Sequence, residues 1–293
     1  MKTRTEDEIM ALILGFAEID DRIRVVLMNG SRVNPSAAQD PFRDFDIAAF
    51  VTDVEPFRDE EYVVLRFGEV IVVEQPLMGP WPPAEADGRH YNYNIQLLDG
   101  HRIDLSFHHL DTLGDHLADS LTAVLIDKDS RLPALPPPNE TSYLITQPTK
   151  ELYDGCCAAF FFSLGSHIPK TLWRRQLPLV KYYIEGWLRE PMTMMLGWEI
   201  GIRTGWEKSL GFKGKHLESL LTPELWNEYK MTYVDCDYDS LWESMFLFLA
   251  IFERSAQLVA ETFGFHFPKE TAAKVTSYLE HVRTLPANAK QIY

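Results

Sequence analysis

Residues 29–51 read NGSRVNPSAAQDPFRDFDIAAFV, a Gly-Ser turn followed by a polar loop and then by two aspartates, Asp44 and Asp46. Asp46 opens the apolar run 47–51, which predicts a buried strand. Alternate residues of a strand face the same way, so both carboxylates are expected on one side. Like charges in such a place need a cation, and Mg²⁺ prefers carboxylate and phosphate oxygens. The pattern predicts a magnesium site at this pair.

The Gly30-Ser31 turn predicts a phosphate-binding site. Residues 24–28 form a short apolar run that indicates a strand leading into Gly30 and Ser31. Glycine lets a ligand approach the backbone closely and leaves amide groups free to bind it, and the serine adds a hydroxyl. We therefore expect phosphates over the turn and the metal over the aspartates, on neighbouring strands.

A third carboxylate follows from a hairpin further along the chain. Residues 91–98 and 102–107 both alternate apolar and polar side chains, and Asp99-Gly100 stands between them, which is a strong hairpin signal. In the second arm, Asp104 lies on the polar face. If that arm lies beside the strand that begins at Asp46, Asp104 joins the aspartate pair.

The remaining pattern predicts an α+β fold, with a mixed sheet and helices in the N-terminal domain and a helical bundle after it. Further helices are expected at 5–18 and 59–67, a strand at 70–74 and a loop at 76–88. Prolines concentrated in residues 132–140 indicate a boundary, which gives domains 1–136 and 137–293. Helical periodicity in the second domain covers residues 149–166, 173–188, 191–204, 217–229, 241–263 and 269–283.

Composition restricts the class of protein. The 293 residues carry a formal net charge of -15, which argues against nucleic-acid binding and suits a cationic partner. The three cysteines fit neither a disulfide framework nor a zinc site. The first residues lack the pattern of a signal peptide, and no apolar run is long enough for a membrane span. We expect a cytoplasmic protein without membrane contact, as a monomer or homodimer.

Six stretches together resemble a known family. They are IRVVLMNGSR, DFDIAAFVTD, GHRIDLSF, PKTLWRRQLP, MMLGWEIGIRTGW and SLGFKGKHL, in this order along the chain. The pattern resembles the polymerase-beta-type nucleotidyltransferases, and the aminoglycoside 6-adenylyltransferases in particular. The resemblance implies transfer of AMP from ATP·Mg²⁺ to the 6-hydroxyl of streptomycin, a cationic aminoglycoside, with release of pyrophosphate.

The resemblance also implies roles for single residues. Gly30 and Ser31 would hold the triphosphate, with Arg32 near it. Asp44 and Asp46 would ligate magnesium and Asp104 would complete the carboxylate set. Asp104 is also our expected base for the attacking hydroxyl.

In the second half, Lys215 matches the second lysine of the family's Ser-Leu-Gly-Lys-x-x-Lys pattern and would bind the phosphate tail. Phe212 replaces the first lysine, and Lys213 is the alternative.

An acidic cleft between the two domains would attract the cationic acceptor. The candidate substrate residues are Glu85, Asp87, Glu190 and Glu199. Two alternatives stay open: adenylylation of another small hydroxylated antibiotic such as a lincosamide, and a nucleotide-binding module without catalysis.

Overall fold

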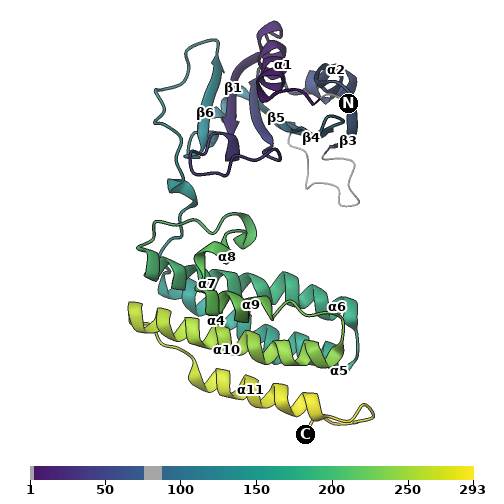
Figure 1. Ribbon diagram of the computed structural model, residues 1–293, viewed down its shortest axis with the longest axis vertical. Helices are drawn as coiled ribbons and strands as arrows, with labels where there is room; N and C mark the ends of the chain where they lie inside the picture. The colour runs from purple at the N-terminus through teal and green to yellow at the C-terminus, as the bar shows by residue number, and fades with distance from the viewer. Residues whose placement is uncertain (1–2, 76–87) are drawn as a thin grey trace. The chain divides into compact units, whose positions relative to one another are not determined.

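The computed structural model describes residues 3–75 and 88–293. The chain divides into two compact units, Met1–Ser142 and Tyr143–Tyr293, which are coloured from purple to teal and from teal to yellow (Figure 1). Residues that follow the last proline of this segment, Pro138, still bond to the first unit: Ser120 Oγ donates to the Asn139 carbonyl oxygen at 2.6 Å, and Asn34 Nδ2 donates to Glu140 at 2.6 Å. The division therefore falls a few residues after the prolines.

Within the described residues, the first unit contains a six-stranded sheet with the order β3-β4-β5-β2-β1-β6. The strands are β1 (Ile23–Asn29), β2 (Phe45–Val51), β3 (Val70–Glu74), β4 (His90–Leu97), β5 (Arg102–His109) and β6 (Thr122–Asp127). Strands β2 and β5 pair in parallel, and the other neighbours are antiparallel. The predicted hairpin of β4 and β5 is confirmed, and so is its expected place beside β2. Strand β6, which was not predicted from the sequence, pairs with β1 and forms that edge of the sheet.

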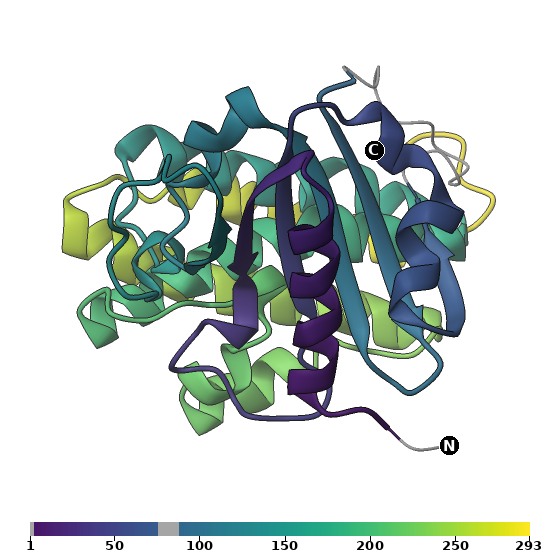
Figure 2. The ribbon, with the colours of Figure 1, turned by 90° about the horizontal axis from the view of Figure 1, so that it is seen from above.

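Helix α1 (Glu6–Ile19) covers one face of this sheet (Figure 2). It begins with the capping box that its sequence contains, because Thr5 Oγ1 accepts from the Glu8 amide and Glu8 accepts from the Thr5 amide. Its buried residues join the apolar side chains of β2, β4 and β5 in one core. The other helices in the described part of this unit are α2 (Glu60–Val64) and α3 (Leu113–His116), and its short 3₁₀ turns are η1 (Gly30–Arg32), η2 (Glu55–Arg58), η3 (Leu65–Phe67) and η4 (Leu110–Thr112). A further 3₁₀ turn, η5 (Thr141–Tyr143), spans the division between the units.

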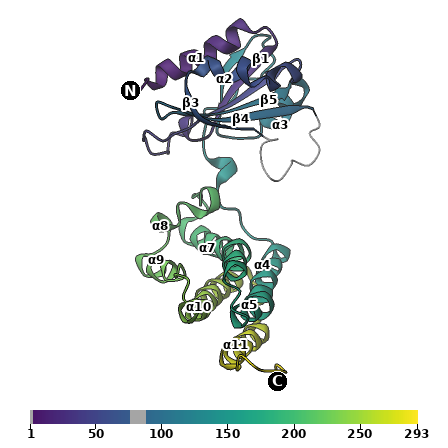
Figure 3. The same cartoon turned by 90° about the vertical axis from the view of Figure 1, so that its right-hand side faces the viewer.

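The second unit is a helical bundle around one apolar core (Figure 3). Its helices are α4 (Lys150–Phe162), α5 (Ile168–Trp173), α6 (Leu177–Tyr182), α7 (Arg189–Thr204), α8 (Leu217–Leu220), α9 (Pro223–Lys230), α10 (Tyr238–Phe263) and α11 (Lys269–Thr284). Two π-helical segments, η6 (Ser163–His167) and η7 (Tyr183–Leu188), and the 3₁₀ turn η8 (Phe212–Gly214) complete the unit. The expected α+β class, a mixed sheet with helices followed by a bundle, is confirmed.

Most of the expected helices are present with bounds shifted by a few residues, and two of them are interrupted. The helix expected at 173–188 begins at Leu177, because Arg175 has a φ of 54° and interrupts the chain after α5. The helix expected at 217–229 is divided into α8 and α9. Leu221 and Thr222 are extended there, and Pro223 starts the second helix. Along residues 3–75 and 88–293, no helix is both long and apolar enough to cross a membrane.

An ion pair between the buried Asp20 and the partly exposed Arg22 connects the end of α1 to the sheet and to α2. The Asp20 carboxylate accepts from Arg22 Nε at 2.9 Å, from Arg22 Nη2 at 2.7 Å and from the Tyr62 hydroxyl at 2.6 Å. Burial by itself raises the pKa of Asp20, but the hydrogen bonds from Arg22 and Tyr62 outweigh it and hold the pKa at about 2. The ionised carboxylate therefore stabilises the folded chain.

Asp20→Asn is expected to lower the free energy of unfolding at pH 7 by about 2 kcal/mol, because charge-assisted hydrogen bonds are lost around a buried group. Since the pKa in the folded chain lies below the ordinary value of 3.8, this stabilisation is present above about pH 4 and is lost as the pH falls toward 2. Urea unfolding of both proteins at several pH values measures it, with the neighbouring Asp21→Asn as control. An equal difference at pH 7 and pH 3 would contradict the assignment.

Candidate active site

A row of polar residues crosses the sheet in register, on the face opposite α1. Its members, one from each strand of the described sheet, are Glu74, Asn94, Asp104, Asp46, Asn29 and Thr122, in order from β3 to β6. Residues paired across neighbouring strands point to the same side. Asp46 and Asp104, which the sequence analysis expected to be close, are therefore direct neighbours in the centre of the row. Asn29 is fixed beside them, because its Nδ2 donates to Thr122 Oγ1 at 2.7 Å.

The Gly-Ser turn at the end of β1 lies against the Asp46 carboxylate. Gly30 has a φ of +74°, and a Cβ built on it would lie 2.1 Å from Asp46 Oδ2 and 2.9 Å from Asp46 Cγ. Glycine is therefore required here both for the backbone conformation and for the close approach. Ser31 follows in η1 and is half-buried. The two parts of the predicted site, turn and aspartate, are in contact.

The ionised forms of Asp44 and Asp46 are disfavoured by their surroundings. Burial, followed by the charges of Asp104 and Asp44, raises the pKa of Asp46 to about 6. Burial also raises the pKa of Asp44, and the charge of Asp104 adds to this, while Arg102 and Arg32 oppose it. A carboxylate with a raised pKa lacks sufficient positive charge nearby. The pair is therefore suited to binding a cation.

Arg102 engages the third carboxylate. Its Nε donates to Asp104 Oδ1 at 2.7 Å and its Nη2 donates to Asp104 Oδ2 at 2.8 Å. The same Nε lies 3.9 Å from Asp44 Oδ2. This bidentate pair fixes the direction of the Asp104 side chain and neutralises it.

The donor set fits Mg²⁺ bound together with phosphate oxygens. Within residues 3–75 and 88–293, no group of three or more His, Cys, Asp or Glu side chains could hold a metal ion. Asp104 already has positive charge beside it in Arg102, whereas the pKa values of Asp44 and Asp46 are raised, so these two carboxylates have the greater need of a cation, and the expected part of Asp104 in the metal site stays a prediction. One or two carboxylates with phosphate oxygens is a common set for Mg²⁺. The raised pKa of both aspartates is consistent with a site that gains from the charge of a cation.

Arg32 supports the loop that carries the first aspartate. Its Nε donates to the Asp44 carbonyl oxygen at 3.0 Å and its Nη2 to the Arg43 carbonyl oxygen at 2.6 Å. Nη1 pairs with Glu6 at 2.8 Å, and the guanidinium lies 3.5 Å over the Phe45 ring. These contacts hold the residues before β2 against the turn that precedes them.

A cavity of about 250 Å³ extends from the aspartates along the same face of the sheet. It is lined by Asn29, Asp46, Ile47, Ala48, Asn92, Asn94, Asp104, Leu105, Ser106, His108 and His116. Asn92 and Asn94 were not among the predicted site residues. The alternation of polar and apolar residues along β4 could have identified them, because it places both side chains on the same face of the sheet as Asp104.

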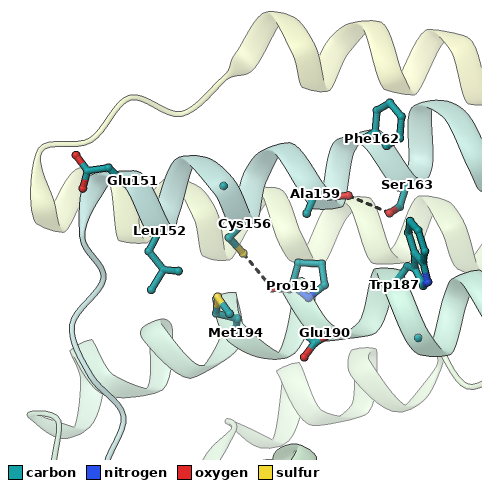
Figure 4. A pocket seen from close by; sticks show the side chains of 12 residues that line it. Glu151, Leu152, Cys156, Ala159, Phe162, Ser163, Trp187, Glu190, Pro191 and Met194 are labelled. Atoms are coloured by element: carbon teal, nitrogen blue, oxygen red, sulfur yellow. Dashed lines mark hydrogen bonds between the residues drawn. The ribbon is translucent and has the colours of Figure 1, made fainter. Parts of the chain in front are cut away.

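The other predicted site residues lie in the second unit or outside the described residues. Lys215 is exposed after η8. Glu190 is exposed, lies 3.6 Å from Lys213 Nζ and lines a cavity of about 590 Å³ beside α4 (Figure 4). Glu199 is half-buried in the bundle, where it accepts from Ser255 Oγ at 2.6 Å. Glu85 and Asp87 lie outside the described residues.

Comparison with known proteins identifies the relatives of this chain. A family model described as streptomycin adenylyltransferase matches residues 3–282. An aminoglycoside 6-adenylyltransferase from Bacillus subtilis is 32% identical over 282 residues, 95% of this chain and 98% of that protein. One from Campylobacter jejuni is 31% identical over 90% of this chain and 91% of that protein. A crystal structure of an aminoglycoside 6-adenyltransferase from Bacillus subtilis is 28% identical, covers 96% of this chain and 100% of its own, and has a TM-score of 0.47.

The chain is therefore a nucleotidyltransferase, as the sequence resemblance implied. Within that class, it belongs to the streptomycin adenylyltransferase family.

Proposed function

We propose that this enzyme transfers AMP from ATP to the 6-hydroxyl of streptomycin and releases pyrophosphate. The observation that carries the proposal is the contact of the Gly30 turn with Asp46, which pairs with Asp104 on the next strand. Relatives named aminoglycoside 6-adenylyltransferase match nearly the whole chain and support the choice of acceptor. The net charge of -15 suits a cationic acceptor.

Asp44 and Asp46 are the residues that would hold Mg²⁺. When bound, the ion would neutralise charge on the phosphates during transfer. Gly30 and Ser31 would present a backbone amide and a hydroxyl to the triphosphate, since the turn lies directly beside Asp46. Arg32 would act through the loop that it holds, because its guanidinium is bonded to the backbone of residues 43 and 44.

Asp104 is the proposed base. Each of its oxygens accepts one hydrogen bond from Arg102 and keeps a further lone pair for the acceptor hydroxyl. In the reaction, the hydroxyl oxygen forms a bond to the α-phosphorus while the bond from that phosphorus to the bridging oxygen breaks. Pyrophosphate leaves with the electron pair of the broken bond, and the hydroxyl proton passes to Asp104. Arg102 orients the base throughout.

Pyrophosphate release with labelled ATP and a panel of aminoglycosides tests this function. We expect release that depends on streptomycin, and labelled AMP attached to the antibiotic. Removal of divalent cations with a chelator is expected to stop it, because the aspartate pair is then left without its counter-charge. Absence of release with every aminoglycoside in the panel would overturn the proposal.

A further inference from the structure

One wall of the cavity beside the aspartates is formed by residues that have no role in the proposed reaction. Strands β4 and β5 contribute Asn92, Asn94, Ser106 and His108 to this wall. Register places Asn94 directly beside Asp104 and Asn92 beside Ser106. The wall therefore continues from the proposed base along the sheet, away from the Gly-Ser turn.

The order of the strands gives this wall a direction. Across the sheet, the turn at the end of β1 comes first, then Asp46 on β2, then Asp104 on β5, then Asn94 on β4. In phosphoryl transfer, the attacking and leaving oxygens lie roughly in line on opposite sides of the phosphorus. With the phosphates over the turn, the acceptor must approach from the β4 and β5 side.

The Asn94 side chain is already oriented for a ligand. Its Nδ2 donates to Glu74 Oε2 on β3 at 3.0 Å. This bond occupies one end of the amide and leaves the carbonyl oxygen as an acceptor for a hydroxyl or an N–H group. Glu74 is thus a positioning residue for Asn94.

The far end of the wall carries no charge near neutral pH. His108 packs against Phe50, with ring centroids 5.4 Å apart, and its ring lies 4.3 Å from that of His116. Burial, and then the neighbouring His116 and His90, lower the pKa of His108 to about 4. Uncharged amide, hydroxyl and imidazole groups can match the many hydroxyl groups of a sugar or cyclitol ring.

We propose that Asn92, Asn94 and Ser106 bind the hydroxylated ring of the acceptor and present one of its hydroxyls to Asp104. The inference rests on the proposed function and names its acceptor subsite. Because the subsite serves the acceptor and not the nucleotide, its loss affects the two Michaelis constants differently.

Steady-state kinetics of the full chain test this subsite. Asn94→Ala and, separately, Asn92→Ala are expected to raise the KM for streptomycin about tenfold and to change the KM for ATP less than twofold. The matched control is Gln96→Ala. Gln96 lies on the same strand and face, but its Nε2 donates to the Gly100 and His101 carbonyl oxygens outside the cavity. We expect both Michaelis constants of that variant to stay within twofold of wild type.

The possible failures are distinguishable. A wild-type chain that transfers AMP to no aminoglycoside overturns the proposed function and this inference with it. Wild-type transfer to streptomycin with an unchanged KM for streptomycin in both asparagine variants overturns the subsite alone. A rise in the KM for ATP alone assigns the wall to the nucleoside and also overturns it. Thermal unfolding of each variant checks its fold, and two independent variants keep the test valid if one of them fails to fold.

Discussion

Asp46→Asn is expected to slow AMP transfer at least about 10³-fold and, at the same time, to stabilise the folded chain at pH 7. The loss of activity follows because the variant lacks one of the two carboxylates, Asp44 and Asp46, that are proposed to bind Mg²⁺. The gain in stability follows from the raised pKa of Asp46, since burial and the charges of Asp104 and Asp44 disfavour its ionised form. Asparagine has nearly the same shape and lacks that charge. A merely structural aspartate would lose stability on this change.

The pH dependence gives this prediction its sign. The folded-state pKa of about 6 lies above the ordinary value of 3.8, so ionisation of Asp46 destabilises the wild-type chain progressively as the pH rises from about 4 to 6. The variant should be more stable by roughly 2 to 3 kcal/mol above pH 6, and equal to the wild type near pH 4. Chemical unfolding in the presence of a chelator measures this without interference from metal.

Asp53→Asn is the matched control for this change. Asp53 follows the other end of β2, and its carboxylate accepts from the Glu55 amide at 3.1 Å. We expect wild-type activity from it. Full activity of Asp46→Asn would show that the metal assignment is wrong. A loss of stability at pH 7 would show that the ionised Asp46 carboxylate is stabilised by positive charge or hydrogen bonds that this structure does not contain.

The centre of the site could be predicted from the sequence because its signals are local. Alternation in residues 102–107 fixes the face of Asp104, and the Asp99-Gly100 turn fixes the hairpin. Only the pairing of β5 with β2 had to be assumed, and it places Asp104 beside Asp46. The capping box at Thr5 is a similar case, since its two partners are three residues apart.

The parts that could not be predicted depend on contacts between distant residues. Strand β6 has its place in the sheet through its pairing with β1, almost a hundred residues earlier. The bond from Asn94 to Glu74 crosses from β4 to β3, and the register of an edge strand leaves no local pattern. Arg102 stands two residues from Asp104, so its position on the same face was predictable. Its bidentate pairing was not, because that choice depends on which charges surround it.

Gly30→Ala is expected to reduce AMP transfer by about 10²-fold or more and to destabilise the first unit, because the new methyl group would occupy the space of the Asp46 carboxylate. Two costs combine in this variant. A positive φ costs an alanine about 1 kcal/mol, and displacement of a buried carboxylate adds roughly 1 to 3 kcal/mol. Gly100→Ala separates them, since Gly100 also has a positive φ of +99° and has nothing within 4 Å of its Cβ position. The Gly100→Ala control should therefore be destabilised by only about 1 kcal/mol, the cost of the positive φ, and keep its activity.

A double-mutant cycle on stability tests whether the Gly30 methyl group acts through Asp46. In an Asp46→Ala background, the carboxylate is absent and only Asp46 Cβ, 3.5 Å from the new methyl group, remains. Gly30→Ala should therefore cost about 1 kcal/mol there, in place of roughly 2 to 4 kcal/mol in the wild type. Chemical unfolding of the four proteins yields the coupling energy, and it does so without any assay of activity. Additive effects would mean that the Gly30 turn and the Asp46 carboxylate are not in contact. They would contradict the proposal that the phosphate-binding turn lies directly beside the metal-binding aspartates.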